Sequence, residues 1–167
     1  MTGNEIQGKT LGILGLGAIG KELSKKSHAL GMNVMAFDIR KDATYLKEHK
    51  YIHFAKNIDE VYANADVISL HLPHTSTSER MIDRTVIFEK LKKSPIIINT
   101  SRGMLIDSQA IVDGLQSKKI RGYLTDVLNK EPMVKDEILK GIDNVIITPH
   151  IGSRTYQSVE RPGLMAV

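Results

Sequence analysis

The sequence predicts a doubly wound α/β domain, with helices on both faces of a parallel sheet in three α/β/α layers. Short apolar runs alternate with segments of helical periodicity, and this alternation is typical of βαβ units. The runs are rich in Ile, Val and Leu and nearly continuous, which indicates strands buried on both faces. The expected strands are residues 10–15, 33–38, 66–73, 95–100, 120–127 and 144–149.

The first expected helix, residues 18–30, has Ile19, Leu23 and Leu30 at helical spacing on one side. These side chains are therefore the expected packing face of the helix. Gly31 follows directly and is a typical residue just beyond a helix end, because it adopts a left-handed backbone without strain. A helix here supplies the crossover that a parallel sheet requires between its first two strands.

Two further helices are predicted from their capping signals. Asn57 precedes "IDEVYANA", and Glu60 lies three residues further on in a capping-box arrangement. Asp107, a good N-cap, precedes "SQAIVDGLQSK". The apolar residues of this last segment recur at helical spacing, at Ile111, Val112 and Leu115. Both segments lie between expected strands, as βαβ crossovers require.

Length and composition exclude several classes of protein. With 167 residues, 41% hydrophobic and 25% charged, one globular domain over residues 1–167 is expected. The net charge of +4 is spread among acids, so nucleic acid is not an expected partner. No apolar run suits a membrane helix and no signal peptide is visible, so we expect a cytoplasmic protein. The absence of cysteine excludes thiolate ligands, and no His and carboxylate spacing suits a metal ion.

The first strand runs into "GLGAIG", Gly15 to Gly20, with the spacing G-x-G-x-x-G. In this motif Gly15 permits a tight turn, Gly17 lets a pyrophosphate approach the backbone, and Gly20 lets the helix pack closely on the strand. Free amides and the dipole at the helix start favour an anionic phosphate. The hexapeptide alone is weak evidence, but its place between a strand and a helix predicts a Rossmann-type dinucleotide site.

Asp38 stands at the tip of the second expected strand, where such a domain holds the adenosine ribose. Its carboxylate can accept hydrogen bonds from both ribose hydroxyls, and its charge would repel a 2′-phosphate. The expected cofactor is therefore NAD rather than NADP, although Arg40 and Lys41 lie close enough to oppose this preference. A glycine turn that binds nothing is the remaining alternative.

Polar residues follow three of the later strands. Arg102 comes after the fourth expected strand, Glu131 lies five residues after Asp126 at the tip of the fifth, and His150 follows the sixth. Each alone has an ordinary alternative: a surface arginine, a helix-capping acid or a loop histidine. Because the carboxyl ends of parallel strands meet at one edge, we expect all three beside the glycine loop.

These residue types suit hydride transfer between a nicotinamide and a carbinol carbon. Histidine can take and return the hydroxyl proton, because free imidazole titrates near neutral pH. A carboxylate such as Glu131 would fix the tautomer of His150 and stabilise its protonated form. Arg102 can hold a substrate carboxylate or carbonyl oxygen through paired charge-assisted bonds.

Five blocks of the sequence resemble signature blocks of the NAD-dependent D-isomer-specific 2-hydroxyacid dehydrogenases, in the order of that family. They are "GKTLGILGLGAIGKELSKKSHALGMNVMAFD", "SLHLP", "INTSRGMLID", "TDVLNKEP" and "TPHIGS". The resemblance implies an oxidoreductase that acts on the CH–OH group of a D-2-hydroxy acid, or reduces its 2-keto acid, with Arg102, Glu131 and His150 as catalytic residues. Glutamate rather than glutamine at 131 argues against the formate dehydrogenase branch. A homodimer is also implied.

The resemblance assigns cofactor contacts as well. The implied pyrophosphate loop is Gly15, Gly17, Ala18, Ile19 and Gly20, and the implied ribose ligand is Asp38. The implied contacts beyond these are Leu72 and Pro73 on the adenine side, Thr100, Ser101 and Arg102 on the nicotinamide side, Asp126 on the carboxamide, and Gly152 and Ser153 beside His150. The remaining histidines, His28, His49, His53 and His74, are interpreted as surface or packing residues, and His71 as structural beside the adenine pocket.

Enzymes of the family have a second domain that holds the substrate and closes over the cofactor. We expect this substrate domain to be absent from the chain, which should then bind NAD with little or no turnover. Pro162-Gly163 would break the long helix that follows the histidine in the family. A catalytically inactive NAD-binding or NAD-sensing module remains the alternative, and lactate, glycerate and phosphoglycerate all remain open as substrates.

Overall fold

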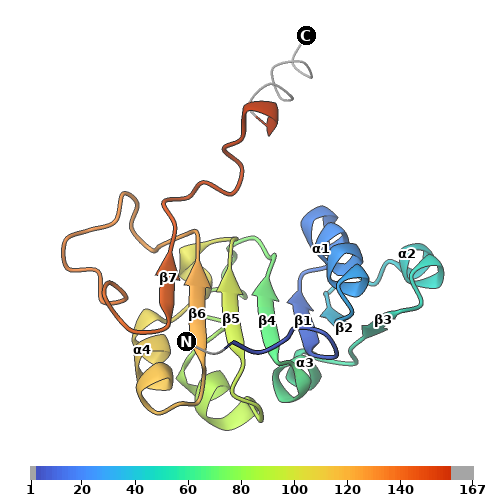
Figure 1. Ribbon diagram of the computed structural model, residues 1–167, viewed down its shortest axis with the longest axis horizontal. Helices are drawn as coiled ribbons and strands as arrows, with labels where there is room; N and C mark the ends of the chain where they lie inside the picture. Colours follow the sequence, from blue (N-terminus) through green and yellow to red (C-terminus); the bar gives the residue numbers. More distant parts are fainter. Residues whose placement is uncertain (1–2, 159–167) are drawn as a thin grey trace.

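The computed structural model describes residues 3–158, which form a seven-stranded parallel sheet (Figure 1). The strand order is β3-β2-β1-β4-β5-β6-β7, so the order reverses between β1 and β4. The bounds are β1 Thr10–Leu14, β2 Asn33–Phe37, β3 Ile52–Phe54, β4 Val67–Leu70, β5 Ile96–Asn99, β6 Gly122–Thr125 and β7 Val145–Ile147. The predicted fold class and all six predicted strands are confirmed. The short β3 was not predicted, because three residues give too little pattern to recognise.

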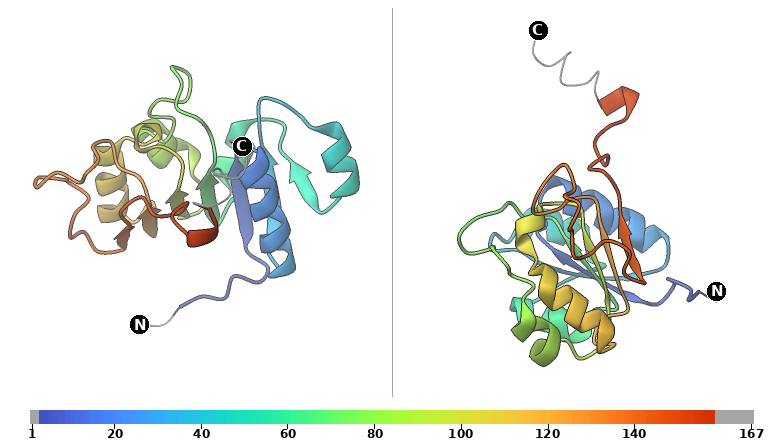
Figure 2. Two further views of the ribbon diagram at one scale, coloured as in Figure 1. Left: turned by 90° about the horizontal axis from the view of Figure 1, so that it is seen from above. Right: turned by 90° about the vertical axis from the view of Figure 1, so that its left-hand side faces the viewer.

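Helices cover both faces of the sheet (Figure 2). They are α1 Ala18–Ala29, α2 Ala43–Glu48, α3 Ile58–Asn64 and α4 Ser108–Gln116, with a π-helical turn at Val86–Lys90 and a 3-10 turn at Gly103–Leu105. Alternate residues of β1 face two separate cores: Ile13 packs in the smaller cluster beside α1, and Leu14 packs in the larger cluster with α3 and α4. Among residues 3–158, no helix is long and apolar enough to cross a membrane.

The predicted starts of α3 and α4 are confirmed. The Asn57 side chain accepts a hydrogen bond from the Glu60 amide at 3.0 Å, and Asp107 caps α4 in the same way. The capping box of α3 is incomplete, because the Glu60 carboxylate accepts from the Lys56 amide instead, at 2.8 Å. The short α2, which was not predicted, has a similar N-cap at Asp42.

The predicted packing face of α1 is right for Leu23, which packs against the smaller core, and wrong for Ile19 and Leu30. Ile19 and Leu30 are 68% and 61% exposed, and the buried residues of the helix are Gly20, Ser24 and Ser27. Close approach of helix and strand explains the difference. A Cβ on Gly20 would overlap the carbonyl oxygen of Gly15, so only small residues fit against the sheet. Ile19 and Leu30 are turned outward.

The prediction that the strands are buried on both faces is confirmed for β1 and β4. It is wrong for the outer strand β7, where Ile146 is 57% exposed. The reason is the placement of α1, which covers only the β1 and β2 side of its face (Figure 1). In the described part of the chain, no helix covers the same face of β7. The predicted helix break at Pro162-Gly163 lies outside the described residues.

Candidate active site

The glycine loop has the geometry that its predicted roles require. Gly15 has a φ of +97°, and a Cβ there would lie 2.5 Å from the carbonyl oxygen of His71 at the end of β4. Only glycine fits this turn. Gly17 differs, because a Cβ there would meet nothing within 4 Å. Its backbone therefore borders open space, where a pyrophosphate can approach.

The N-terminus of α1 is the phosphate-binding feature of the loop. Helices α2, α3 and α4 all begin with a side-chain cap, whereas α1 has Gly17 as its N-cap, without a side-chain bond, and has no acid in its first turn. Its first amides thus have no side-chain partner and lie at the positive end of the helix dipole. This arrangement fits the pyrophosphate of a dinucleotide.

Asp38 is tied to the same loop. Its Oδ2 accepts a hydrogen bond from the Leu16 amide at 2.7 Å, and its Oδ1 accepts from the Arg40 amide at 2.9 Å. Each carboxylate oxygen can accept a further bond, so two ribose hydroxyls can still be held. Backbone contacts also fix the carboxylate beside the glycine turn. The residues present therefore fit a dinucleotide with a free 2′-hydroxyl.

A buried asparagine shapes the turn that carries Arg102. Asn99, at the end of β5, donates to the Arg102 carbonyl at 2.9 Å and accepts from the Ser101 amide at 3.0 Å. Ser101 in turn donates to the Leu72 carbonyl at 2.5 Å and joins the β4 and β5 strand ends. The Arg102 guanidinium donates to the Ser101 carbonyl at 2.6 Å, and no ion pair among residues 3–158 includes it. Its charge is therefore free to hold an anion.

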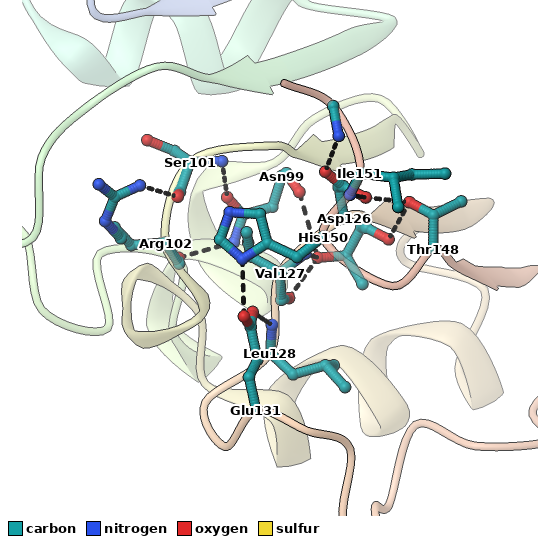
Figure 3. Close-up of polar contacts among 12 residues, drawn as sticks. Asn99, Ser101, Arg102, Asp126, Val127, Leu128, Glu131, Thr148, His150 and Ile151 are labelled. Carbon is teal, nitrogen blue, oxygen red and sulfur yellow. Dashed lines mark hydrogen bonds and ion pairs between the residues drawn. The ribbon is translucent and has the colours of Figure 1, made fainter. Parts of the chain in front are cut away.

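Glu131 and His150 form a direct pair, although they come from separate loops. His150 Nδ1 lies 2.6 Å from Glu131 Oε2, and the other carboxylate oxygen accepts from the Leu128 amide at 2.9 Å (Figure 3). The bonds from His150 and Leu128 hold the pKa of Glu131 below its ordinary value. An ionised carboxylate only accepts, so Nδ1 must carry the hydrogen. Nε2 is then the nitrogen left for a substrate.

Asp126 is the anchor of the loop that carries His150. Its Oδ1 accepts from Thr148 Oγ1 at 2.5 Å and from the Ile151 amide at 2.9 Å, and its Oδ2 accepts from the Gly152 amide at 2.7 Å (Figure 3). Burial opposes ionisation of Asp126, but these bonds outweigh it and hold its pKa below the ordinary value. The predicted contact of Asp126 with a carboxamide stays a prediction.

The anchor explains an unusual backbone at His150, which has a φ of +53°. A non-glycine residue in this region is strained, so surrounding bonds must hold it. The three bonds to Asp126 bracket His150 on both sides in the chain, through Thr148 before it and Ile151 and Gly152 after it. They fix where the imidazole stands above the sheet edge.

The three predicted catalytic residues line one cavity of about 330 Å³, in which His74 and Asn129 also take part. A larger, mostly apolar cavity of about 650 Å³ lies along β7 and shares Leu128, Glu131 and His150 with the first. His74, interpreted as a surface or packing residue, is exposed and also lines this cavity. Sequence reasoning also missed Asn99 and Thr148, whose partners lie in other strands or loops.

Comparison with known proteins agrees with this geometry. Residues 1–152 match the model of a family described as D-isomer specific 2-hydroxyacid dehydrogenase, NAD binding domain. A hydroxypyruvate reductase of Thermotoga maritima is 39% identical, over 100% of this chain and 53% of its own length. The structure of a glyoxylate reductase from Paecilomyes thermophila has a TM-score of 0.88 at 34% identity, over 98% of this chain and 48% of that one.

A further solved structure was determined with NAD bound. It is a D-isomer specific 2-hydroxyacid dehydrogenase from Lactobacillus delbrueckii ssp. bulgaricus, with a TM-score of 0.86 at 29% identity, over 98% of this chain and 52% of that one. The chain thus spans about half the length of these relatives. The family match covers most of the chain, and the glycine loop, the uncapped α1 and Asp38 fit the dinucleotide. The chain therefore belongs to the D-isomer specific 2-hydroxyacid dehydrogenases, as the NAD binding domain of that family, and its cofactor is NAD.

Proposed function

We propose that this chain is the cofactor-binding and catalytic part of an NAD-dependent oxidoreductase that interconverts a D-2-hydroxy acid and its 2-keto acid. The observation that carries the proposal is the 2.6 Å pair between His150 and Glu131 in the same cavity as Arg102. Scaffolding alone requires none of these three groups. A module that only senses NAD therefore has less support.

Each of the three residues has a distinct role. When bound, the reduced cofactor supplies a hydride to C2 of the keto acid. His150 gives the proton on Nε2 to the carbonyl oxygen, and takes it back in the reverse direction. Glu131 holds Nδ1 and stabilises the imidazolium before the proton is given. Arg102 pairs with the substrate carboxylate and orients C2.

The residue assignments to cofactor contacts belong to the same proposal. Asp38 holds the adenosine ribose, and the amides at the start of α1 hold the pyrophosphate. The assignment of residues 1–167 to a single dinucleotide-binding domain rests on length, composition and the family resemblance, and the homodimer rests on the resemblance alone. The cytoplasmic location rests on the sequence features described above. Sedimentation of the purified chain with and without NADH tests the dimer, and a monomer in both conditions contradicts it.

Binding measurements test the function without relying on turnover. Calorimetric titration should give a much higher affinity for NADH than for NADPH. The NADH-loaded chain is then titrated with oxamate, an isostere of pyruvate that cannot be reduced. Arg102→Gln and His150→Asn should each weaken oxamate binding by roughly tenfold or more, since each removes a bond to a charged group, while both variants still bind NADH through the glycine loop and Asp38.

Three results would contradict the proposal. They are no NADH binding, equal affinity for NADPH, and oxamate binding that neither variant weakens. Turnover is measured separately, by loss of NADH with glyoxylate, pyruvate or hydroxypyruvate. Ordinary enzyme rates would overturn the expectation that this chain alone reacts slowly.

A further inference from the structure

His74 occupies an unexpected position at the candidate site. It follows β4 by four residues and so stands at the carboxyl edge of the sheet, beside the strand that leads to Arg102. Its side chain, 33% exposed, lines the same 330 Å³ cavity as Arg102 and His150. A fourth strand end thus contributes a titratable group to a site for which three were predicted.

The loop that carries His74 is held in place by its own hydroxyl groups. Ser78 Oγ donates to the Pro73 carbonyl at 2.8 Å and accepts from the Thr75 amide at 2.8 Å, and Thr75 Oγ1 lies 3.0 Å from Thr77 Oγ1. These bonds close a compact turn on both sides of His74. The imidazole is therefore presented from a fixed backbone.

The polar groups in the cavity offer donors more than acceptors. Glu131, the carboxylate that lines it, already accepts from Leu128 and His150. His74 Nε2 lies 3.8 Å from Glu79 Oε2, which is within ion-pair distance but too long for a hydrogen bond, so a hydrogen on Nε2 can be donated to a ligand. Together with Arg102, it gives the cavity two donors that two acceptor groups of one ligand could use. A volume of about 330 Å³ is at the small end for ligand sites and suits an acid of a few carbons.

We infer that His74 determines substrate specificity by donating a hydrogen bond to an oxygen on C3 of the 2-hydroxy or 2-keto acid, while Arg102 holds the C1 carboxylate. The inference rests on the proposed function and narrows it. The preferred substrate carries a hydroxyl or phosphate on C3 rather than a bare methyl. Met104, Val127 and Leu128 also line the cavity and would favour the methyl group if His74 took no part.

The test compares ligands that differ in one group. The chain saturated with NAD is titrated with D-glycerate, D-lactate and 3-phospho-D-glycerate, with binding followed by NMR shifts. D-glycerate and D-lactate differ only in the C3 hydroxyl. The variants are His74→Leu, which removes the donor, His74→Gln, which keeps one, and His53→Leu as the matched control. His53 lies in β3, the edge strand farthest in the sheet from β6 and β7. Its Nε2 lies 2.6 Å from Glu60 Oε1.

We expect the wild-type chain to bind D-glycerate about fivefold to tenfold more tightly than D-lactate, the range for one hydrogen bond. His74→Leu should abolish this preference, His74→Gln should restore part of it, and His53→Leu should leave it unchanged. A preference for 3-phospho-D-glycerate over D-glycerate would identify the C3 group as phosphate, and the reverse order would identify it as hydroxyl.

The inference is overturned if the wild type binds both acids equally, if His74→Leu keeps the preference, or if no acid binds the NAD-loaded chain. Its failure is distinguishable from failure of the proposed function. The affinity for NADH and the loss of oxamate affinity in Arg102→Gln both test the proposed function, and neither measurement depends on His74.

Discussion

The Asp126 anchor gives the most specific prediction about stability. Asp126→Asn keeps the shape of the side chain but replaces one acceptor oxygen with an NH2 group. In one orientation the NH2 group faces the Gly152 amide, which lies 2.7 Å from Oδ2 in the native chain. In the flipped orientation it faces the Ile151 amide, 2.9 Å from Oδ1. Either way two donors meet, so one native bond is lost and the negative charge is gone.

The expected loss can be estimated from the three bonds. A hydrogen bond to a charged group contributes about 1.5–3 kcal/mol, and a buried donor without a partner costs about 1–3 kcal/mol. Asp126 is only 7% exposed, so solvent compensates little. Loss of one bond and weakening of two should lower the free energy of unfolding by about 3 kcal/mol. For a chain of this size that corresponds to a fall in Tm of roughly 6–12 °C.

Urea unfolding of Asp126→Asn and of Asp136→Asn, an exposed acid used as the control, measures this difference. The pKa of Asp126 is lowered in the folded state, so its stabilisation is complete above its ordinary value of 3.8. It is lost as the pH falls through the lower folded value. The gap between wild type and Asp126→Asn should therefore shrink below about pH 4. A gap within about 0.5 kcal/mol of the control at neutral pH would refute the anchor.

Three further predictions concern the cofactor loop and the catalytic pair. Gly20→Ala should lower the free energy of unfolding, measured in urea, by roughly 1–3 kcal/mol, because the added Cβ overlaps the backbone of Gly15. Gly17→Ala, whose Cβ meets nothing, should leave the free energy of unfolding unchanged and weaken NADH binding in calorimetric titrations. Asp38→Ala should weaken NADH binding and reduce the ratio of the affinities for NADH and NADPH. An unchanged ratio would contradict the role of Asp38 in holding the ribose. Glu131→Gln should shift the imidazole nitrogen NMR signals of His150 away from the Nδ1–H tautomer, and unchanged signals would contradict the pairing.

The features that could be predicted from sequence are those encoded in neighbouring residues. The glycine motif, the strand before it and the caps at Asn57 and Asp107 are each visible within a few positions. The face of α1 could not be predicted from apolar periodicity, because the constraint there is close approach to β1 rather than burial of large side chains. Ser24 and Ser27 carry no apolar signal, yet they are buried.

The site required contacts between residues far apart in the chain, which one sequence does not reveal. Asp126 and Thr148 are 22 residues apart, and His150 and Glu131 are 19 apart. The strand ends predicted that these groups share an edge, but the same rule applies to His74, which also follows a strand and was set aside. Its imidazole lines the cavity that holds Arg102 and His150, so the edge rule alone is enough to place it there, whereas its donor role depends on side-chain geometry that the sequence does not show.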